Sequence, residues 1–203
     1  MNERILLLGG SLTTPSRSEA LLYALADQLV TNGARPTVWN LAADTLPAPH
    51  RRHGTGATGS SGRLVQAARD AEGYVLVSPV YHGSFSGALK DALDHLRIDH
   101  VAGKPVALAS TAGRHPTSQA VDQLRLVVRS LHAVAIPAQL LTAEPDYDWS
   151  GRAFGLTGSA IIERLERLVD ELLWFTAAFR RPTVGTGAVA VAERALRRSD
   201  GHD

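Results

Sequence analysis

The sequence predicts an α/β domain in which helices cover both faces of a five-stranded parallel sheet. Three observations support this fold class: five short apolar runs recur along the chain, segments with helical spacing separate them, and 203 residues with 44% hydrophobic content suit one domain. The first run, Ile5 to Leu8, is apolar throughout rather than alternating, which indicates a strand buried on both faces.

The five predicted strands are bounded by glycine, proline or polar residues. The first reads Ile-Leu-Leu-Leu and stops at Gly9 and Gly10. The last contains Pro137, which cannot donate to a central ladder, so this strand is expected at an edge of the sheet. The predicted strands occupy residues 5–8, 36–41, 73–78, 104–110 and 133–141.

The segments between the strands carry apolar residues on one helical face. In the first of them Leu21, Leu22, Leu25 and Leu29 form this face, and Asn32 with the glycine after it ends the helix. Helices are predicted at residues 18–30, 63–71, 86–96, 119–131 and 159–180, and loops at 42–61 and 145–158. Residues 1–181 are expected to form the domain and residues 182–203 a flexible or helical tail.

Five alternating strands favour the flavodoxin-like strand order 2-1-3-4-5 over a six-stranded dinucleotide fold. In that order ligands bind outside the carboxyl ends of strands one, three and four, at the topological switch point. The site is therefore expected at that edge of the sheet.

The overall composition excludes several function classes. A net charge of +1 gives no bulk field for nucleic acid or membrane surfaces, and the absence of cysteine excludes disulfides and thiol chemistry. The apolar run near the N-terminus is too short for a signal peptide, and no stretch has the length of a membrane span. A soluble cytoplasmic protein is expected.

Three loops rich in Gly, Ser, Thr and Pro follow the strands that border the switch point. The first, GGSLTTPSRS at 9–18, offers hydroxyls and Arg17 before a helix N-terminus, which favours an anion. The alternative is that these are only capping and turn residues. The second, SPVYHGSFSG at 78–87, could present Tyr81 and His82 to a planar aromatic ligand, or these two could be ordinary surface residues. The third is STAGRHP at 110–116.

These loops resemble those of the NADPH-dependent FMN reductases, including the reductase partners of two-component alkanesulfonate monooxygenases. GGSLTTPSRSEALLYAL resembles their phosphate loop, SPVYHGSFSGALKDALDHL their Pro-Val-Tyr loop and helix start, and STAGRH their third flavin loop. The similarity spans residues 4–142. Thr13 stands where family members often carry an arginine, so one cation near the phosphate is lost.

The resemblance implies FMN and NADPH, with NADH as a second option, and hydride transfer at flavin N5 without a catalytic side chain. No metal site is expected, because the sequence has no cysteine and no His-Glu-x-x-His motif. The implied cofactor-binding residues are Ser11, Thr13, Ser16, Arg17, Ser18, Pro79, Val80, Tyr81, His82, Gly83, Ser84, Ser110, Thr111, Ala112 and Gly113. The predicted function is an NAD(P)H-dependent FMN reductase that passes electrons to free flavin, a quinone, O2 or a partner monooxygenase. A homodimer or homotetramer is expected from the family.

Two other functions remain open on this scaffold. One is an FMN-dependent dehydrogenase dedicated to a single biosynthetic metabolite. The other is a non-enzymatic flavin electron carrier, although such carriers are usually strongly acidic. The glycine pattern at 54–59 is rejected as a nucleotide motif because no strand precedes it. Tyr147 and Trp149 could cover a flavin edge or a subunit interface, or simply pack a loop.

Overall fold

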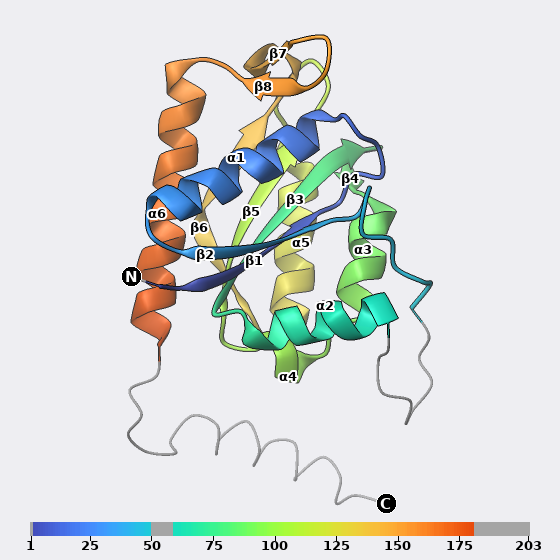
Figure 1. Ribbon diagram of the computed structural model, residues 1–203, viewed down its shortest axis with the longest axis vertical. Helices are drawn as coiled ribbons and strands as arrows, with labels where there is room; N and C mark the ends of the chain where they lie inside the picture. Colours follow the sequence, from blue (N-terminus) through green and yellow to red (C-terminus); the bar gives the residue numbers. More distant parts are fainter. Residues whose placement is uncertain (1, 50–58, 181–203) are drawn as a thin grey trace, which may run out of the picture.

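Five parallel strands form the central sheet of the structure, a computed structural model that describes residues 2–49 and 59–180 (Figure 1). Their order is β2-β1-β3-β5-β6, which confirms the predicted order 2-1-3-4-5 when only the parallel strands are counted. These strands are β1 (Arg4–Gly9), β2 (Arg35–Asn40), β3 (Gly73–Tyr81), β5 (Pro105–Thr111) and β6 (Val134–Thr142). The predicted tail at 182–203 lies outside the described residues.

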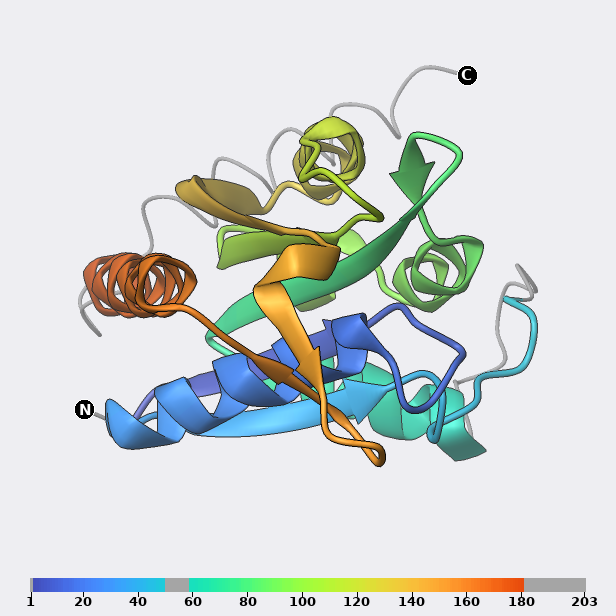
Figure 2. The ribbon, with the colours of Figure 1, turned by 90° about the horizontal axis from the view of Figure 1, so that it is seen from above.

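Helices cover both faces of the sheet, and Figure 2 shows the two layers from above. Helices α1 and α6 pack on one face, and α2, α3, α4 and α5 lie on the other. Their bounds are α1 (Arg17–Thr31), α2 (Gly59–Asp70), α3 (Gly87–Asp94), α4 (Ile98–Val101), α5 (Gln119–Ser130) and α6 (Ser159–Phe179). Among the described residues, no helix is both long and apolar enough to cross a membrane.

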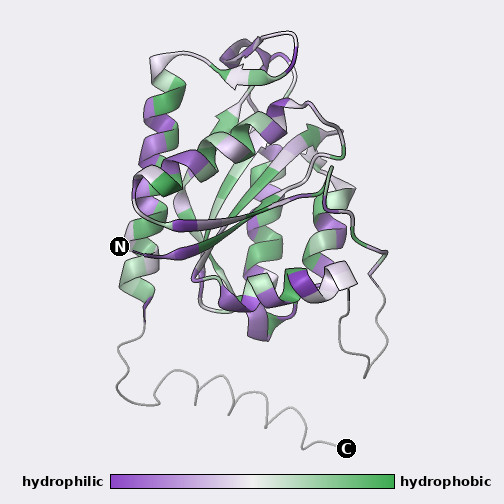
Figure 3. Ribbon diagram, in the orientation of Figure 1, coloured by the Kyte–Doolittle hydropathy of each residue, from purple (hydrophilic) through white to green (hydrophobic). Residues whose placement is uncertain are grey.

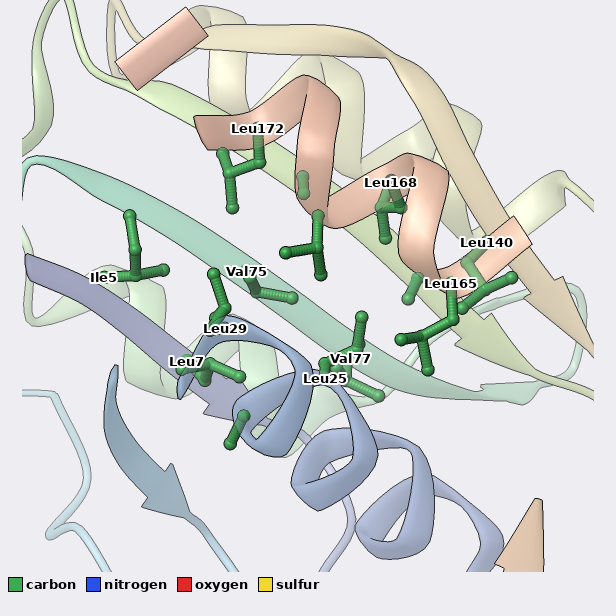
Figure 4. Packing of buried hydrophobic residues seen from close by; sticks show 14 of the residues in the cluster. Ile5, Leu7, Leu25, Leu29, Val75, Val77, Leu140, Leu165, Leu168 and Leu172 are labelled. Carbon is green, nitrogen blue, oxygen red and sulfur yellow. The ribbon is translucent and has the colours of Figure 1, made fainter. Parts of the chain in front are cut away.

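Alternate residues of the central strands supply two separate cores. Ile5 and Leu7 of β1 face α1 and α6, where they meet leucines of both helices (Figure 4). Leu6 and Leu8 of the same strand face α2, α3 and α5. Both sets are fully buried, which explains why the strands are apolar throughout. Figure 3 shows the same pattern, with hydrophobic residues along the strands and polar residues on the outer faces of the helices.

The edge strand β6 contains an irregularity at Pro137. Between Val106 and Leu108 of β5, the register on β6 advances from Ala135 to Gln139. Because proline has no N–H to donate, the ladder is interrupted there, as the sequence predicted for an edge position. The bulge thus leaves carbonyl and amide groups that need other partners.

Side chains from the two neighbouring helices supply those partners. Arg125 of α5 donates to the carbonyls of Ile136 and Pro137, at 2.9 Å and 3.2 Å. The Glu171 carboxylate of α6 accepts from the Ala138 N–H at 2.8 Å. The bulge is therefore a fixed part of the fold.

Five short elements were not predicted from the sequence. The predicted loop at 145–158 is wrong in part, because β7 (Tyr147–Trp149) and β8 (Phe154–Leu156) form an antiparallel hairpin after the 3-10 turn η1 (Glu144–Asp146). Strand β4 (Ser84–Phe85) pairs with the end of β3, and α4 is a single turn. Helix α2 also begins before its predicted start. The five unpredicted elements have at most four residues each, too few to show a hydrophobic period.

Candidate functional site

The three predicted loops meet at one edge of the sheet. They follow β1, β3 and β5, which are neighbouring parallel strands, so their carboxyl ends lie side by side at the upper edge in Figure 1. The first loop leads directly into α1 and the second into α3 through β4. The third leads into α5, so the predicted site residues come together at the switch point of the fold.

The first loop ends at a helix N-terminus with free amide groups. Ser16 is the N-cap of α1, and its hydroxyl accepts from the Glu19 N–H at 3.1 Å. The N–H groups of Leu12, Arg17 and Ser18 have no acceptor within the described part of the chain. Together with the dipole of the 15-residue helix α1, these donors favour an anion.

Two carboxylates of the chain itself lie beside this helix end. Glu19 accepts hydrogen bonds from the Thr14 hydroxyl at 2.8 Å, the Ser16 N–H at 3.3 Å and the Asn40 amide at 2.9 Å. Arg17 lies 3.6 Å from a carboxylate oxygen of Glu144, which begins the turn after β6. The sequence did not predict either carboxylate as part of the site.

The second loop is a tight hairpin turn between β3 and β4. His82 and Gly83 both have positive φ, 50° and 75°, as the two central residues of a type I′ turn require. Tyr81 before the turn is 52% exposed. The turn therefore presents backbone and an aromatic side chain to solvent at the site edge.

A glutamine of α5 holds this turn in place. The Gln123 side chain accepts from the Ser84 hydroxyl at 2.5 Å and donates to the Gly83 carbonyl at 3.1 Å. Both bonds join residues that are about 40 positions apart in the chain. Gln123 is thus a positioning residue for the second loop.

Of two buried serines in the second loop, one connects this loop to the first and the other holds it internally. The Ser86 hydroxyl donates to the Gly10 carbonyl at 2.7 Å and caps α3 by accepting from the Leu89 N–H at 3.2 Å. The Ser86 N–H donates to the Ser78 hydroxyl at 2.9 Å. Neither serine was predicted to have a role, and the bond from Ser86 to Gly10 joins residues that are 76 positions apart in the chain.

The third loop is tied to the first loop and to the turn after β6. The hydroxyls of Ser18 and Thr111 form a buried hydrogen bond. The Ala112 N–H donates to the Thr142 carbonyl at 2.9 Å, and the Glu144 N–H donates to the Gly113 carbonyl at 2.8 Å. These bonds hold the loop close to the N-terminus of α1.

Tyr147 of β7 also helps to hold the third loop in place. Its buried hydroxyl is 2.7 Å from the Thr142 hydroxyl, which donates to the Ser110 carbonyl at 3.0 Å. Burial raises the pKa of the Tyr147 phenol, so it stays protonated. Trp149 of the same strand is 52% exposed and contacts Phe154, with ring centroids 4.8 Å apart.

The predicted site residues divide into two groups. The hydroxyls of Ser11, Ser16, Ser18 and Thr111 are already bonded within the protein. Groups that remain available at the surface include Thr13, Tyr81, His82 and Gly113, together with the free amides of the first loop. The hydroxyls thus shape the loops, and backbone N–H groups are left to face a ligand.

Other parts of the described chain offer no comparable site. Across residues 2–49 and 59–180, no group of three or more His, Asp or Glu side chains could hold a metal ion. Two surface hollows of about 410 Å³ and 490 Å³ lie at the amino ends of the strands, away from the three loops. In the larger one, the Lys104 ammonium donates to three carbonyls, those of Ala68, Arg69 and His100, and so supports the fold.

Known proteins are similar to this chain in sequence and in fold. The chain is 32% identical over 178 residues to the FMN-dependent NADPH-azoreductase of Staphylococcus aureus, covering 84% of this chain and 93% of that protein. Two solved structures have the same fold: an apo NADH:FMN oxidoreductase named EMOB, with TM-score 0.69 and 22% identity, and FerB, an NAD(P)H:(acceptor) oxidoreductase of Paracoccus denitrificans, with TM-score 0.71 and 19% identity. The matches cover 89% of this chain and 92% of the first structure, and 87% and 98% for the second. Residues 3–148 match the NADPH-dependent FMN reductase family, and the chain is a member of that family.

Proposed function

We propose that this member of the family takes a hydride from NADPH, or from NADH, and passes electrons through FMN to a small-molecule acceptor. The observation that carries this function is the meeting of the three loops beside the free amides at the N-terminus of α1. The acceptors we include are free flavin, quinones, azo compounds, O2 and a partner monooxygenase. The azoreductase relative supports the choice of small acceptors.

The residues present fit FMN. The free N–H groups of Leu12, Arg17 and Ser18 suit a phosphate monoester, because amides at a helix N-terminus donate to anions. The hairpin turn at His82 and Gly83 offers open backbone for one edge of a planar ring. Donors for both ends of a flavin nucleotide are therefore available at one edge of the sheet.

In this proposal the protein binds and orients, and needs no acid or base of its own. When bound, FMN supplies a hydride acceptor at its N5 atom. The first loop would hold the phosphate, the segment from Pro79 to Ser84 would support the ring, and the backbone from Ser110 to Gly113 would face its pyrimidine side. Gln123 and Ser86 keep the second loop fixed by the bonds described above.

We further propose a cytoplasmic homodimer or homotetramer. NADPH is a cytoplasmic metabolite, which supports the location. Trp174 and Phe179 on the outer face of α6 are 65% and 40% exposed, and their apolar area supports contact with another copy. Size-exclusion chromatography with light scattering tests the assembly.

The test of the function is stopped-flow absorbance of the protein loaded with FMN and mixed with NADPH without oxygen. Rapid bleaching of the flavin band is the expected result, and NADH is run in parallel. FMN that binds but stays oxidised with both nucleotides would contradict a reductase and favour a dedicated dehydrogenase or a carrier. Acceptors are then compared by their rates of reoxidising the reduced protein.

A further inference from the structure

We propose that Glu144 lowers the affinity of the site for the FMN phosphate, so that FMN exchanges with solution instead of remaining permanently bound. This inference rests on the proposed function, since it concerns the same flavin site. It starts from the ion pair between Glu144 and Arg17, which are separated by 3.6 Å. Arg17 is also the cation expected to bind the phosphate.

The Glu144 carboxylate is kept near Arg17 by a rigid turn. The Glu144 N–H donates to the Gly113 carbonyl at 2.8 Å. On the other side of the turn, the Asp146 carboxylate accepts from the Ala143 N–H at 2.7 Å, and the buried Tyr147 hydroxyl is 2.7 Å from that of Thr142. The backbone of Glu144 is therefore fixed from both sides, which places its side chain within reach of Arg17.

The carboxylates near the helix end weaken the attraction that its free amides and dipole exert on a phosphate. Arg17 is the cation of the first loop, and it already has Glu144 as its partner. Glu19 adds another carboxylate, which occupies the Thr14 hydroxyl and the Ser16 N–H. The two carboxylates and one guanidinium carry a net negative charge. A bound phosphate would add a further charge of about −1.5 to −2. FMN must therefore compete with Glu144 for Arg17.

The exposure of the two side chains sets how strongly Glu144 can weaken FMN binding. The Glu144 side chain is 68% exposed and that of Arg17 29%, so solvent screens the pair and its strength is modest. Such a pair weakens the binding of a competing anion without preventing it. Riboflavin has the same ring system but no phosphate, so Glu144 should not affect its binding. The difference between the two ligands isolates the charge effect.

The experiment compares dissociation constants for FMN and for riboflavin, measured by quenching of flavin fluorescence. The proteins are the wild type, Glu144→Gln, Glu144→Lys and the control Glu166→Gln, which removes an exposed carboxylate from α6. FMN is expected to bind about two- to fivefold more tightly to Glu144→Gln, and more tightly again to Glu144→Lys. Riboflavin binding should stay within about twofold in all four proteins, and the control should match the wild type.

A second measurement tests exchange directly. Release of FMN is followed by stopped-flow after mixing the loaded protein with an excess of a flavin-binding apoprotein. Release from Glu144→Gln is expected to be slower by about the factor gained in affinity, because affinity changes within one site appear mainly in the off-rate. Raising the salt concentration should narrow the gap between wild type and variant.

Three results would overturn this inference. FMN affinity that is unchanged or reduced in Glu144→Gln would mean that Glu144 orients Arg17 or has no influence. An equal gain in the affinity of Glu144→Gln for riboflavin would show that Glu144 acts on binding of the ring rather than of the phosphate. Binding of neither flavin by the wild type would overturn it together with the proposed function, and this differs from the first two results, in which the flavin site survives.

Discussion

The Ser86 hydroxyl donates to the Gly10 carbonyl at 2.7 Å and thereby joins two site loops that are 76 residues apart in the chain. The same oxygen accepts from the Leu89 N–H and caps α3. Ser86 is 2% exposed, so water cannot replace these bonds. One buried hydroxyl thus couples the stability of a helix to the geometry of the site.

Replacing Ser86 with alanine should therefore affect stability and flavin binding together. Loss of the cap and of a buried hydrogen bond is expected to lower the free energy of unfolding by about 1–3 kcal/mol. Urea denaturation measures this loss, and an FMN titration measures the accompanying fall in affinity. The matched control is Ser130→Ala, an exposed serine whose hydroxyl bonds only the nearby Val127 carbonyl. Equal stability of the two variants would contradict the coupling.

Replacing Arg17 with alanine tests the phosphate site. A charge-assisted hydrogen bond contributes about 1.5–3 kcal/mol, so FMN affinity should fall by that amount while riboflavin affinity stays nearly constant. Isothermal titration calorimetry with both ligands makes the comparison. Arg167→Ala, on the exposed face of α6, serves as the control. If FMN binds Arg17→Ala as it binds the wild type, Arg17 has no role in holding the phosphate.

Replacing Gly83 with valine should disrupt the hairpin turn of the second loop. A β-branched residue is strained at a φ of 75°, and an added Cβ would lie 3.2 Å from the Gln119 side-chain oxygen. Flavin binding is expected to be lost while far-ultraviolet circular dichroism stays native. The control is Gly87→Ala, because a Cβ at Gly87 meets nothing within 4 Å. Normal flavin loading of Gly83→Val would place the ring elsewhere.

The buried His100 predicts how stability depends on pH. Burial lowers the pKa of its imidazole, and its Nδ1 accepts from the Arg97 N–H at 3.1 Å, a bond that the neutral ring makes. In the unfolded chain the imidazole of His100 titrates near pH 6.5, so the folded state binds fewer protons than the unfolded state below that pH. The contribution of neutral His100 to the free energy of unfolding is therefore fully present above about pH 6.5. It falls as the pH drops towards the lower folded pKa, by at most about 1.4 kcal/mol per pH unit.

Urea denaturation between pH 5 and pH 7.5 measures this slope. The slope should be smaller in His100→Gln, where the titrating group is gone, whatever that variant loses in absolute stability. His132→Asn, at an exposed histidine with positive φ, should keep the slope of the wild type. An equal slope in His100→Gln would assign the pH dependence to other groups.

The main features of the fold were predictable because a strand buried on both faces appears in the sequence as a continuous apolar run. The runs around Leu6 and Val75 are apolar throughout, and Pro137 marked the edge strand. Short elements left no such signal. The turn at His82 and Gly83 forms without the Asn-Gly or Asp-Gly pair that usually marks it, so β4 went unpredicted. The hairpin of β7 and β8 has strands of three residues, too few to show alternation.

The site was predictable at the level of loops and less so at the level of contacts. Gly, Ser and Thr after strands one, three and four marked the loops correctly at one edge. The partners of their hydroxyls were not predictable, because a bond such as that between Ser18 and Thr111 depends on how distant segments meet. The position of Glu144 beside Arg17 has the same origin, since it depends on the turn after β6. Binding of the cofactor by these residues stays a prediction.

The bulge in β6 has a consequence for how molecules of this protein can associate. Exposed sheet edges tend to recruit strands from other chains, and β6 is such an edge. Here Pro137 has no N–H, Arg125 occupies two carbonyls and Glu171 occupies the Ala138 N–H. An incoming strand would find the middle of this edge already saturated. The sheet is therefore protected from growing into an aggregate along β6.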